Sequence, residues 1–483
     1  MSAEKTPRDL ARGQLPPLYL PIEIKSREFR AKLLLACHAA EAGFPVVLGS
    51  HQEFSRRLPS LPPGIYAEKA IHATCLHDVL RDRVCGNRVV AWCEEGLNIF
   101  NHDFYGRVRV SPEVVSHLDR FFAWGANQAE AVATAAPSIA PRTVLAGNPR
   151  FDVLRPPFRQ ALEPSAQRLR DEYGPFLLVN TNFAIFNNYF SYDFFLAKKI
   201  YATAALCEDL RDFLHDWYEY TRETFERFKA VVRRLGREFP ELRIIVRPHP
   251  SENRENWERA TEGLDNVLVR MEGSAIPWIL ASRAMMHNNC TTGVEAYVLG
   301  KPVVSYRPVR DQRYAQELSN AVSRAAFDED AAVAALREAM AEPEHSEGYA
   351  VLAPAAQAVV DRYVANLGGR FSCEIMVEAL KDLAQRTSSA KAGGRFERVA
   401  PPLSLQTKLA WRLREFKVSG RAKLSRLAGG GKQDFAYEKH KFPGVDPEEI
   451  ASRLEFFRQA TGRFGNVRAS RVSGSRTLFC VEA

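Results

Sequence analysis

The sequence lacks paired cysteines. Its eight cysteines are scattered, with no C-x-x-C pair and no histidine at zinc-ligand spacing beside them. Disulfide frameworks and structural zinc sites need such spacing, so the sequence argues against both and fits a reducing compartment. The cysteines are Cys37, Cys75, Cys85, Cys93, Cys207, Cys290, Cys373 and Cys480.

Long apolar runs are also missing. No stretch reaches the roughly 18 uncharged apolar residues that a membrane span requires. The N-terminal segment "MSAEKTPRDLARGQLPP" has no apolar core of the kind that a secretory signal contains. We therefore expect a cytoplasmic protein.

An excess of positive over negative charge is absent from most of the chain and is found only at its C-terminal end. Residues 366–483 hold 22 Lys and Arg against 12 Asp and Glu, which accounts for the whole formal charge of +8. Within this region, 405–427 has leucines near one helical face and basic residues elsewhere. One interpretation is a basic amphipathic helix on an anionic inner-membrane surface, and the other is a helix docked on its own protein. No feature points to nucleic acid.

The body of the chain alternates short β-branched runs with helical patterns, which is typical of parallel sheets with crossover helices. We expect two Rossmann-like domains at 15–165 and 174–365, followed at 366–483 by a basic linker, the amphipathic helix and a terminal helix. Open sheets of this kind bind ligands at the carboxyl ends of their strands. Motifs at strand ends are therefore the candidates for function.

The segment "RIIVRPHPSE" places Arg247, His249 and Pro250 directly after an apolar strand. Prolines on both sides restrict the backbone of the histidine, so its imidazole could donate a proton or hydrogen bond to a phosphate leaving group. The alternative is that His249 only caps local backbone.

A second motif, "HNNCTTGVEAYVLGKPVV", follows the next candidate strand. Its hydroxyls, asparagine amide and glycine at a helix start predict a phosphate-binding turn, although a simple N-cap threonine would explain one hydroxyl. The glutamate in this helix could bind a ribose diol or favour the helix dipole. The candidates are Asn288, Thr291, Thr292, Gly293 and Glu295.

In the first domain, "AWCEEGLNIF" sets Glu94 and Glu95 side by side after a strand. One carboxylate could act as a general base, with a pKa raised by crowding from the other. An acidic solvated turn is the alternative. Lys25 and Arg27, after the first strand, could grip an acidic sugar or acceptor, or could form surface ion pairs. Asn180 and Asn182 could line the donor site or satisfy a turn.

These elements resemble the motifs of GT-B transferases that use CMP-activated acidic sugars, the sialyltransferases and Kdo transferases of capsule and lipopolysaccharide assembly. Glu94-Glu95-Gly96, His249-Pro250 and Thr291-Thr292 match their acidic, H-P and paired-hydroxyl motifs. The chain is also similar to bacterial surface carbohydrate biosynthesis proteins at "EIKSREF", "GNPRFD", "NTNF", "RPHPSE" and "EAYVLGKPV". The resemblance implies a GT-B fold, with two Rossmann-like domains facing across a cleft.

By this resemblance, Glu94 or Glu95 would be the general base, His249 would assist departure of CMP, and the two threonines would hold its phosphate. The expected partners are a CMP-activated acidic sugar and a glycan or glycolipid acceptor, with neither a cofactor nor a metal. Transfer of a polyol phosphate from a CDP donor and a non-catalytic scaffold in a polysaccharide assembly complex are the alternatives.

Overall fold

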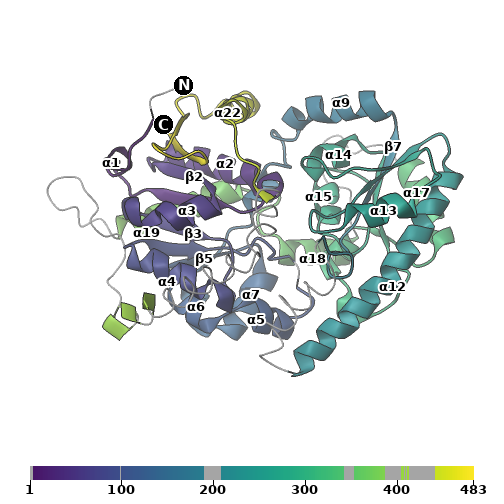
Figure 1. Ribbon diagram of the computed structural model, residues 1–483, viewed down its shortest axis with the longest axis horizontal. Coiled ribbons are helices and arrows are strands. Elements are labelled where there is room, and N and C mark those ends of the chain that lie inside the picture. Colours follow the sequence, from purple (N-terminus) through teal and green to yellow (C-terminus); the bar gives the residue numbers. More distant parts are fainter. Residues whose placement is uncertain are drawn as a thin grey trace, which may run out of the picture. The chain divides into compact units, whose positions relative to one another are not determined.

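The computed structural model describes residues 4–97, 99–189, 208–341, 353–386, 404–406, 408–409, 411–412 and 441–483. The chain divides into two compact units (Figure 1). Unit 1 comprises Met1–Val153 and Asp361–Ala483, and unit 2 comprises Leu154–Val360. Each unit contains one sheet covered by helices, and each is described by itself.

The sheet of unit 1 has the strand order β13-β14-β2-β1-β3-β4-β5-β6. Pairing is parallel from β2 to β6, whereas β14 and β13 are added antiparallel at one edge. The central strand β1 is buried along its whole length, as expected for a parallel sheet covered on both faces. The strands are β1 (Leu18–Ile22), β2 (Val46–Ser50), β3 (Ile65–Glu68), β4 (Arg88–Ala91), β5 (Arg120–Ala123), β6 (Thr143–Leu145), β13 (Arg468–Arg471) and β14 (Leu478–Glu482).

The helices of unit 1 include α2, which follows β1 and buries a continuous run from Leu33 to Ala40. The α-helices are α1 (Pro7–Leu10), α2 (Lys25–Glu41), α3 (His51–Arg57), α4 (Leu76–Val84), α5 (His102–Arg109), α6 (Pro112–Ser116), α7 (Ala126–Ala135), α8 (Pro149–Asp152), α19 (Ser372–Gln385) and α22 (Pro447–Thr461). Three 3-10 helices, η1 (Leu58–Ser60), η2 (Ala73–Cys75) and η3 (Pro137–Arg142), connect them.

The C-terminal part of the chain completes unit 1. Strand β14 pairs with β2, and the carboxylate of Asp152 accepts hydrogen bonds from the backbone N–H groups of Ser372 (3.0 Å) and Cys373 (2.8 Å) at the start of α19. The terminal helix α22 has the expected N-cap, because Asp446 accepts from the backbone N–H of Glu448 at 3.0 Å. The sequence division set 366–483 apart, whereas these contacts join its described residues to the first sheet.

The sheet of unit 2 is parallel throughout, with the order β12-β11-β10-β7-β8-β9. Its strands are β7 (Phe176–Asn180), β8 (Arg243–Arg247), β9 (Val267–Val269), β10 (Ala284–His287), β11 (Val303–Tyr306) and β12 (Arg324–Ala326). The α-helices are α9 (Glu163–Tyr173), α12 (Glu208–Glu238), α13 (Arg254–Ala260), α14 (Ala275–Ala281), α15 (Thr292–Val298), α16 (Glu317–Ala321), α17 (Glu329–Ala341) and α18 (Pro354–Tyr363), at whose end the chain returns to unit 1; η4 (Gln160–Leu162) and η6 (Gln312–Tyr314) are 3-10 helices.

The core of unit 2 forms where the apolar face of α12 meets the sheet (Figure 1). Phe225 and Phe228 each lie 5.2 Å, centroid to centroid, from the ring of Phe183, and Val232 and Leu235 are buried beside them. Such aromatic pairs add about 0.5–1.5 kcal/mol beyond the burial of their area. The recurrence of these residues in the sequence therefore marks a packed helix, as predicted.

The predicted amphipathic helix lies only partly within the described residues. Leu405, Gln406, Lys408, Leu409, Trp411 and Arg412 are helical, and the rest of 405–427 lies outside them. Trp411 packs against a core cluster of unit 1, whereas Leu405 and Leu409 are 82% and 59% exposed. Among the helices that the structure describes, none combines the length and apolar character needed to cross a membrane.

Close contact between β2 and the C-terminal segment generates a prediction. A Cβ atom at Gly49 would lie 2.0 Å from the carbonyl oxygen of Thr477. Gly49→Ala should therefore displace β14 and destabilise unit 1 by about 1–3 kcal/mol, the usual cost of overpacking. Urea unfolding of both proteins measures this difference. Gly465→Ala is the control, because a Cβ there meets nothing within 4 Å, and equal losses in the two variants would contradict the prediction.

Candidate functional site

The carboxyl edge of the unit 2 sheet collects the polar segments that the sequence singled out. Strand β7 lies between β10 and β8, and all three are parallel. The loops that follow them, at 181–188, 248–253 and 288–291, therefore emerge at the same edge. This edge is the candidate site of unit 2.

The carboxylate of Glu252 links two of these loops. It is completely buried, and its Oε1 accepts hydrogen bonds from Thr181 Oγ1 (2.8 Å) and from the backbone N–H groups of Phe183 (3.0 Å) and His249 (3.0 Å). Its Oε2 accepts from Asn187 Nδ2 (3.2 Å) and Trp257 Nε1 (3.0 Å). Burial raises the pKa of Glu252 although these donors favour the carboxylate.

The imidazole of His249 is oriented by its own turn. Its Nδ1 accepts a hydrogen bond from the backbone N–H of Ser251 at 3.2 Å, and its carbonyl accepts from the N–H of Glu252 at 2.7 Å. When Nδ1 is an acceptor, the proton of the neutral ring resides on Nε2. Because Ser251 donates to Nδ1, the neutral ring of His249 has the tautomer in which Nε2–H is a donor. The residue is half-buried.

Asn288 joins the loop after β10 to the loop after β7. Its Oδ1 accepts from the backbone N–H of Asn182 at 2.8 Å, and its Nδ2 donates to the Asn182 carbonyl at 3.2 Å. Asn289 follows in the left-handed region, with φ of 47°, and its Oδ1 accepts from Asn320 Nδ2 at 3.2 Å. The segment 181–183 is thus tied on one side to Glu252 and the His249 turn and on the other to Asn288.

His287 supports the same loop from inside the sheet. It is fully buried, its Nδ1 accepts from the backbone N–H of Cys290 at 3.1 Å, and its Nε2 lies 2.9 Å from Ser323 Oγ. Burial, together with the nearby Arg307, lowers the pKa of His287 to about 3. A Cβ at Gly293 would lie 2.5 Å from Nε2, so only glycine fits above the ring.

The turn at Thr291 differs from the predicted phosphate-binding turn, because its backbone N–H groups bond within the turn itself. The N–H groups of Gly293 and Val294 already donate to the carbonyls of Cys290 and Thr291, each at 3.0 Å. The Thr291 side chain makes no capping hydrogen bond, and Thr292 Oγ1 donates to Cys290 Sγ at 3.1 Å. Glu295 is buried within α15. Phosphate binding here stays a prediction that depends on the hydroxyls.

Arg247 and Asn180 end their strands with buried side chains. The Arg247 guanidinium donates to the carbonyls of Glu272 and Gly273, both at 3.1 Å, and lies 4.9 Å from the ring centroid of Trp278. Burial lowers its pKa to about 10. Asn180 Nδ2 contacts Met285 Sδ at 3.4 Å, while its Oδ1 is buried without a hydrogen-bond partner in the described part of the chain. Pro250 is exposed.

In unit 1, Glu94 belongs to a buried ionic cluster. Its Oε1 accepts from Lys32 Nζ at 3.0 Å and from Trp92 Nε1 at 2.9 Å. Lys32 also donates to Glu28 at 2.8 Å and to the Pro21 carbonyl at 2.6 Å. Burial would raise the pKa of Glu28, but Lys32 and Arg27 lower it to about 2. Glu94 is therefore held as the partner of a buried ammonium.

Glu95 pairs with different cations. It forms ion pairs with Arg109 and, at 3.9 Å, with Arg27, and its side chain is 38% exposed. The two glutamates thus face separate positive charges instead of crowding each other. Burial opposes the charge of Arg27, but Glu28, Glu94 and Glu95 raise its pKa. Lys25 pairs with Glu449 at 2.6 Å, so it holds α22.

Sequence reasoning missed Glu252, His287 and Lys32, the side chains that hold the candidate residues in place. The acid of "RPHPSE" stands three residues after His249, a spacing that could have suggested a turn cap. No local signal identified Lys32, because it lies in an apolar helix and its partner Glu94 is distant in sequence.

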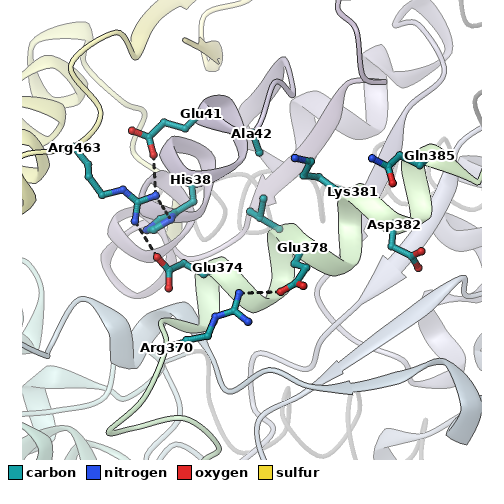
Figure 2. Close-up of a pocket in the computed structure, with 11 residues that line it drawn as sticks. His38, Glu41, Ala42, Arg370, Glu374, Glu378, Lys381, Asp382, Gln385 and Arg463 are labelled. Atoms are coloured by element: carbon teal, nitrogen blue, oxygen red, sulfur yellow. Dashed lines mark hydrogen bonds and ion pairs between the residues drawn. The ribbon is translucent and has the colours of Figure 1, made fainter.

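A groove of about 680 Å³ in unit 1 lies elsewhere (Figure 2). It lies between the C-terminal part of α2 and α19, and none of the predicted site residues lines it. The guanidinium group of Arg463 forms ion pairs with Glu41 and with Glu374, each at 2.9 Å. Its lining residues come from α2, α19 and the segments beside them in unit 1, so the groove does not extend the candidate site of unit 2.

Comparison with known proteins yields similarity of structure alone. No protein-family model and no curated protein matches the sequence. S. aureus MnaA, solved with UDP, has 12% identity and a TM-score of 0.46, over 76% of this chain and 96% of that one. A putative UDP-N-acetylglucosamine 2-epimerase from Listeria monocytogenes has 11% identity and a TM-score of 0.46, over 77% and 97%. UDP-GlcNAc 2-epimerase from Neisseria meningitidis, bound to UDP-GlcNAc, has 12% identity and a TM-score of 0.44, over 76% of this chain and 99% of that one.

The fold prediction is confirmed: the chain has two Rossmann-like α/β units of the GT-B type. The prediction of a transferase for CMP-activated acidic sugars is wrong, since UDP-GlcNAc 2-epimerases are among the solved structures to which the chain is similar. The physical reason is that an H-P turn and paired hydroxyls are suited to phosphate. Every nucleotide sugar carries phosphate, so these motifs could not identify cytidine.

The hydrogen bonds of Glu252 generate a second prediction. Glu252→Gln replaces one acceptor oxygen by an NH2 group that faces donors, and each donor left without an acceptor costs about 1–3 kcal/mol. We expect a clear loss of unfolding free energy, measured by urea denaturation. The control is Glu255→Gln, an exposed glutamate three residues further on, in α13. Unchanged stability of Glu252→Gln would show that these donors do not depend on the carboxylate.

Proposed function

We propose that the chain is an enzyme of bacterial surface carbohydrate synthesis that acts on a nucleoside-diphosphate sugar. The carboxyl edge of unit 2 would hold the phosphates. The observation that carries this proposal is the placement of His249, whose Nε2–H tautomer is fixed by Ser251 and whose backbone is fixed by Glu252. Thr291 and Thr292 follow β10, which β7 separates from β8, at the same edge of the sheet, and Thr291 would supply a hydroxyl donor.

In the proposed role, Nε2–H of His249 donates a hydrogen bond to the diphosphate of the bound sugar nucleotide. Such a donor stabilises charge that develops during the reaction and is typically worth a factor of about 10²–10⁴ in rate.

The third prediction tests the nucleotide. UDP and UDP-GlcNAc are the first ligands to try, with CMP and ADP beside them, by isothermal titration calorimetry. We expect UDP to bind, and His249→Gln to weaken binding about tenfold through loss of one hydrogen bond to a charged group. His215→Gln, an exposed histidine on α12, should bind as the wild type does. If none of the four nucleotides binds, the proposal is wrong.

We further propose that the enzyme is cytoplasmic and associates with the inner membrane through the exposed leucines near 405. Trp411 fixes this short helical stretch to unit 1, and its ring stacks on His77 at 6.5 Å. Leu405 and Leu409 point away from the core cluster, with Lys408 and Arg412 beside them. Apolar side chains flanked by cations suit the surface of an anionic bilayer.

The fourth prediction concerns this surface. Leu405→Ser with Leu409→Ser should reduce sedimentation with phosphatidylglycerol vesicles, because apolar area no longer enters the bilayer. Wild-type binding should also fall as salt is raised from about 0.1 M, where the Debye length is about 10 Å. Leu145→Ser, another exposed leucine of unit 1, is the control. Wild-type protein that stays in the supernatant would refute membrane association.

A further inference from the structure

Two arginines stand together at the carboxyl end of β11. Arg307 follows the strand directly, and Arg310 lies three residues later. Both guanidinium groups lie over the ring of Phe327, at 4.8 Å and 4.2 Å from its centroid. The backbone N–H of Arg307 also donates to the carbonyl of Ala326 at 2.7 Å, which places the pair beside the end of β12.

These two cations have no acidic partner within the described residues of the chain. Neither forms an ion pair there, and Arg307 Nε is buried without a hydrogen-bond partner. Burial lowers the pKa of Arg307, Tyr220 raises it, and Arg310 lowers it again. The neighbouring Arg313 differs, since Asp311 and Asp216 both pair with it.

Two like charges on one aromatic ring repel each other, and a buried guanidinium N–H without an acceptor adds a further cost. The ring offers only a cation–π contribution to offset these costs. An anion between the two guanidinium groups would remove the repulsion and supply the missing acceptor. Arginine is suited to this role, because its planar fork matches two phosphate oxygens at once.

The position of the pair connects it to the candidate site. Strand β11 is parallel to β10, with Ser305 beside His287. Ser305 Oγ donates to Asn320 Oδ1 at 2.7 Å, and Asn320 Nδ2 donates to Asn289 Oδ1 at 3.2 Å. Arg307 is also close enough to His287 to lower its pKa. The arginines therefore lie at the same sheet edge as the threonine turn, one strand further out.

We propose that Arg307 and Arg310 form a second phosphate subsite, which binds one phosphate of a nucleoside diphosphate while the Thr291 turn and His249 contact the other. This inference rests on the proposed function and adds to it a reason for a diphosphate in preference to a monophosphate. Neither arginine was among the candidate residues of the sequence analysis. Phe327, the residue that follows β12, contacts both guanidinium groups.

The test compares UDP with UMP by isothermal titration calorimetry. In the wild type, UDP should bind more tightly than UMP. Arg307→Gln and Arg310→Gln should each weaken the binding of UDP about tenfold, which is the effect of losing one charge-assisted hydrogen bond, and should leave the binding of UMP nearly unchanged. Arg310 is an exposed position. Arg307→Lys, which keeps the charge but loses the fork, should lie between. The control is Arg337→Gln, since Arg337 also stacks on a phenylalanine (Phe239) but pairs with Glu238.

The outcomes separate this inference from the proposed function. If UDP binds and the arginine variants bind it as the wild type does, the subsite is wrong and the proposed function stands. If the wild type binds none of UMP, UDP, UDP-GlcNAc, CMP and ADP, the proposed function fails, and inorganic pyrophosphate becomes the probe. Pyrophosphate binding that is lost in Arg310→Gln would then support the subsite alone, and equal affinity in both proteins would overturn it.

Discussion

The buried carboxylate of Glu252 is the interaction on which the edge of unit 2 depends. A carboxylate without a cationic partner is expensive to bury, and five hydrogen-bond donors from two loops and α13 compensate for the loss of water. Because each donor comes from a different residue, the carboxylate fixes the separation of those segments. The orientation of His249 follows from this constraint, and Asn288 extends it to the next loop.

In unit 1, a buried charge is stabilised by ion pairs with groups of opposite charge. Lys32 is buried between Glu28 and Glu94, and a buried ammonium is tolerated only when it is paired in this way. The acidic pair after β4 is therefore divided in its roles: Glu94 neutralises Lys32 inside the unit, while the half-exposed Glu95 faces Arg27 and Arg109. Adjacent residues of one type thus have different environments and different ionic partners.

The motifs at strand ends limit how precisely the ligand can be inferred from the sequence. Histidine and hydroxyl groups at strand ends are suited to phosphate, and the structure places them at one sheet edge in unit 2. The nucleobase and the sugar are selected by the shape of a pocket, which distant residues form together. The motifs therefore predicted a phosphate-bearing ligand, but they could not support the choice of CMP.

The sequence by itself determined the two α/β units, the packed face of α12 and the Asp446 cap of α22, because periodicity and capping act between residues close in the chain. It also located His249 and the threonine turn, since loops after parallel strands must lie at one edge. Only the tertiary structure decided that β14 completes the first sheet, that Lys32 binds Glu94, and that Arg307 and Arg310 share Phe327. These contacts join residues far apart in sequence, and their energy depends on burial that no local pattern records.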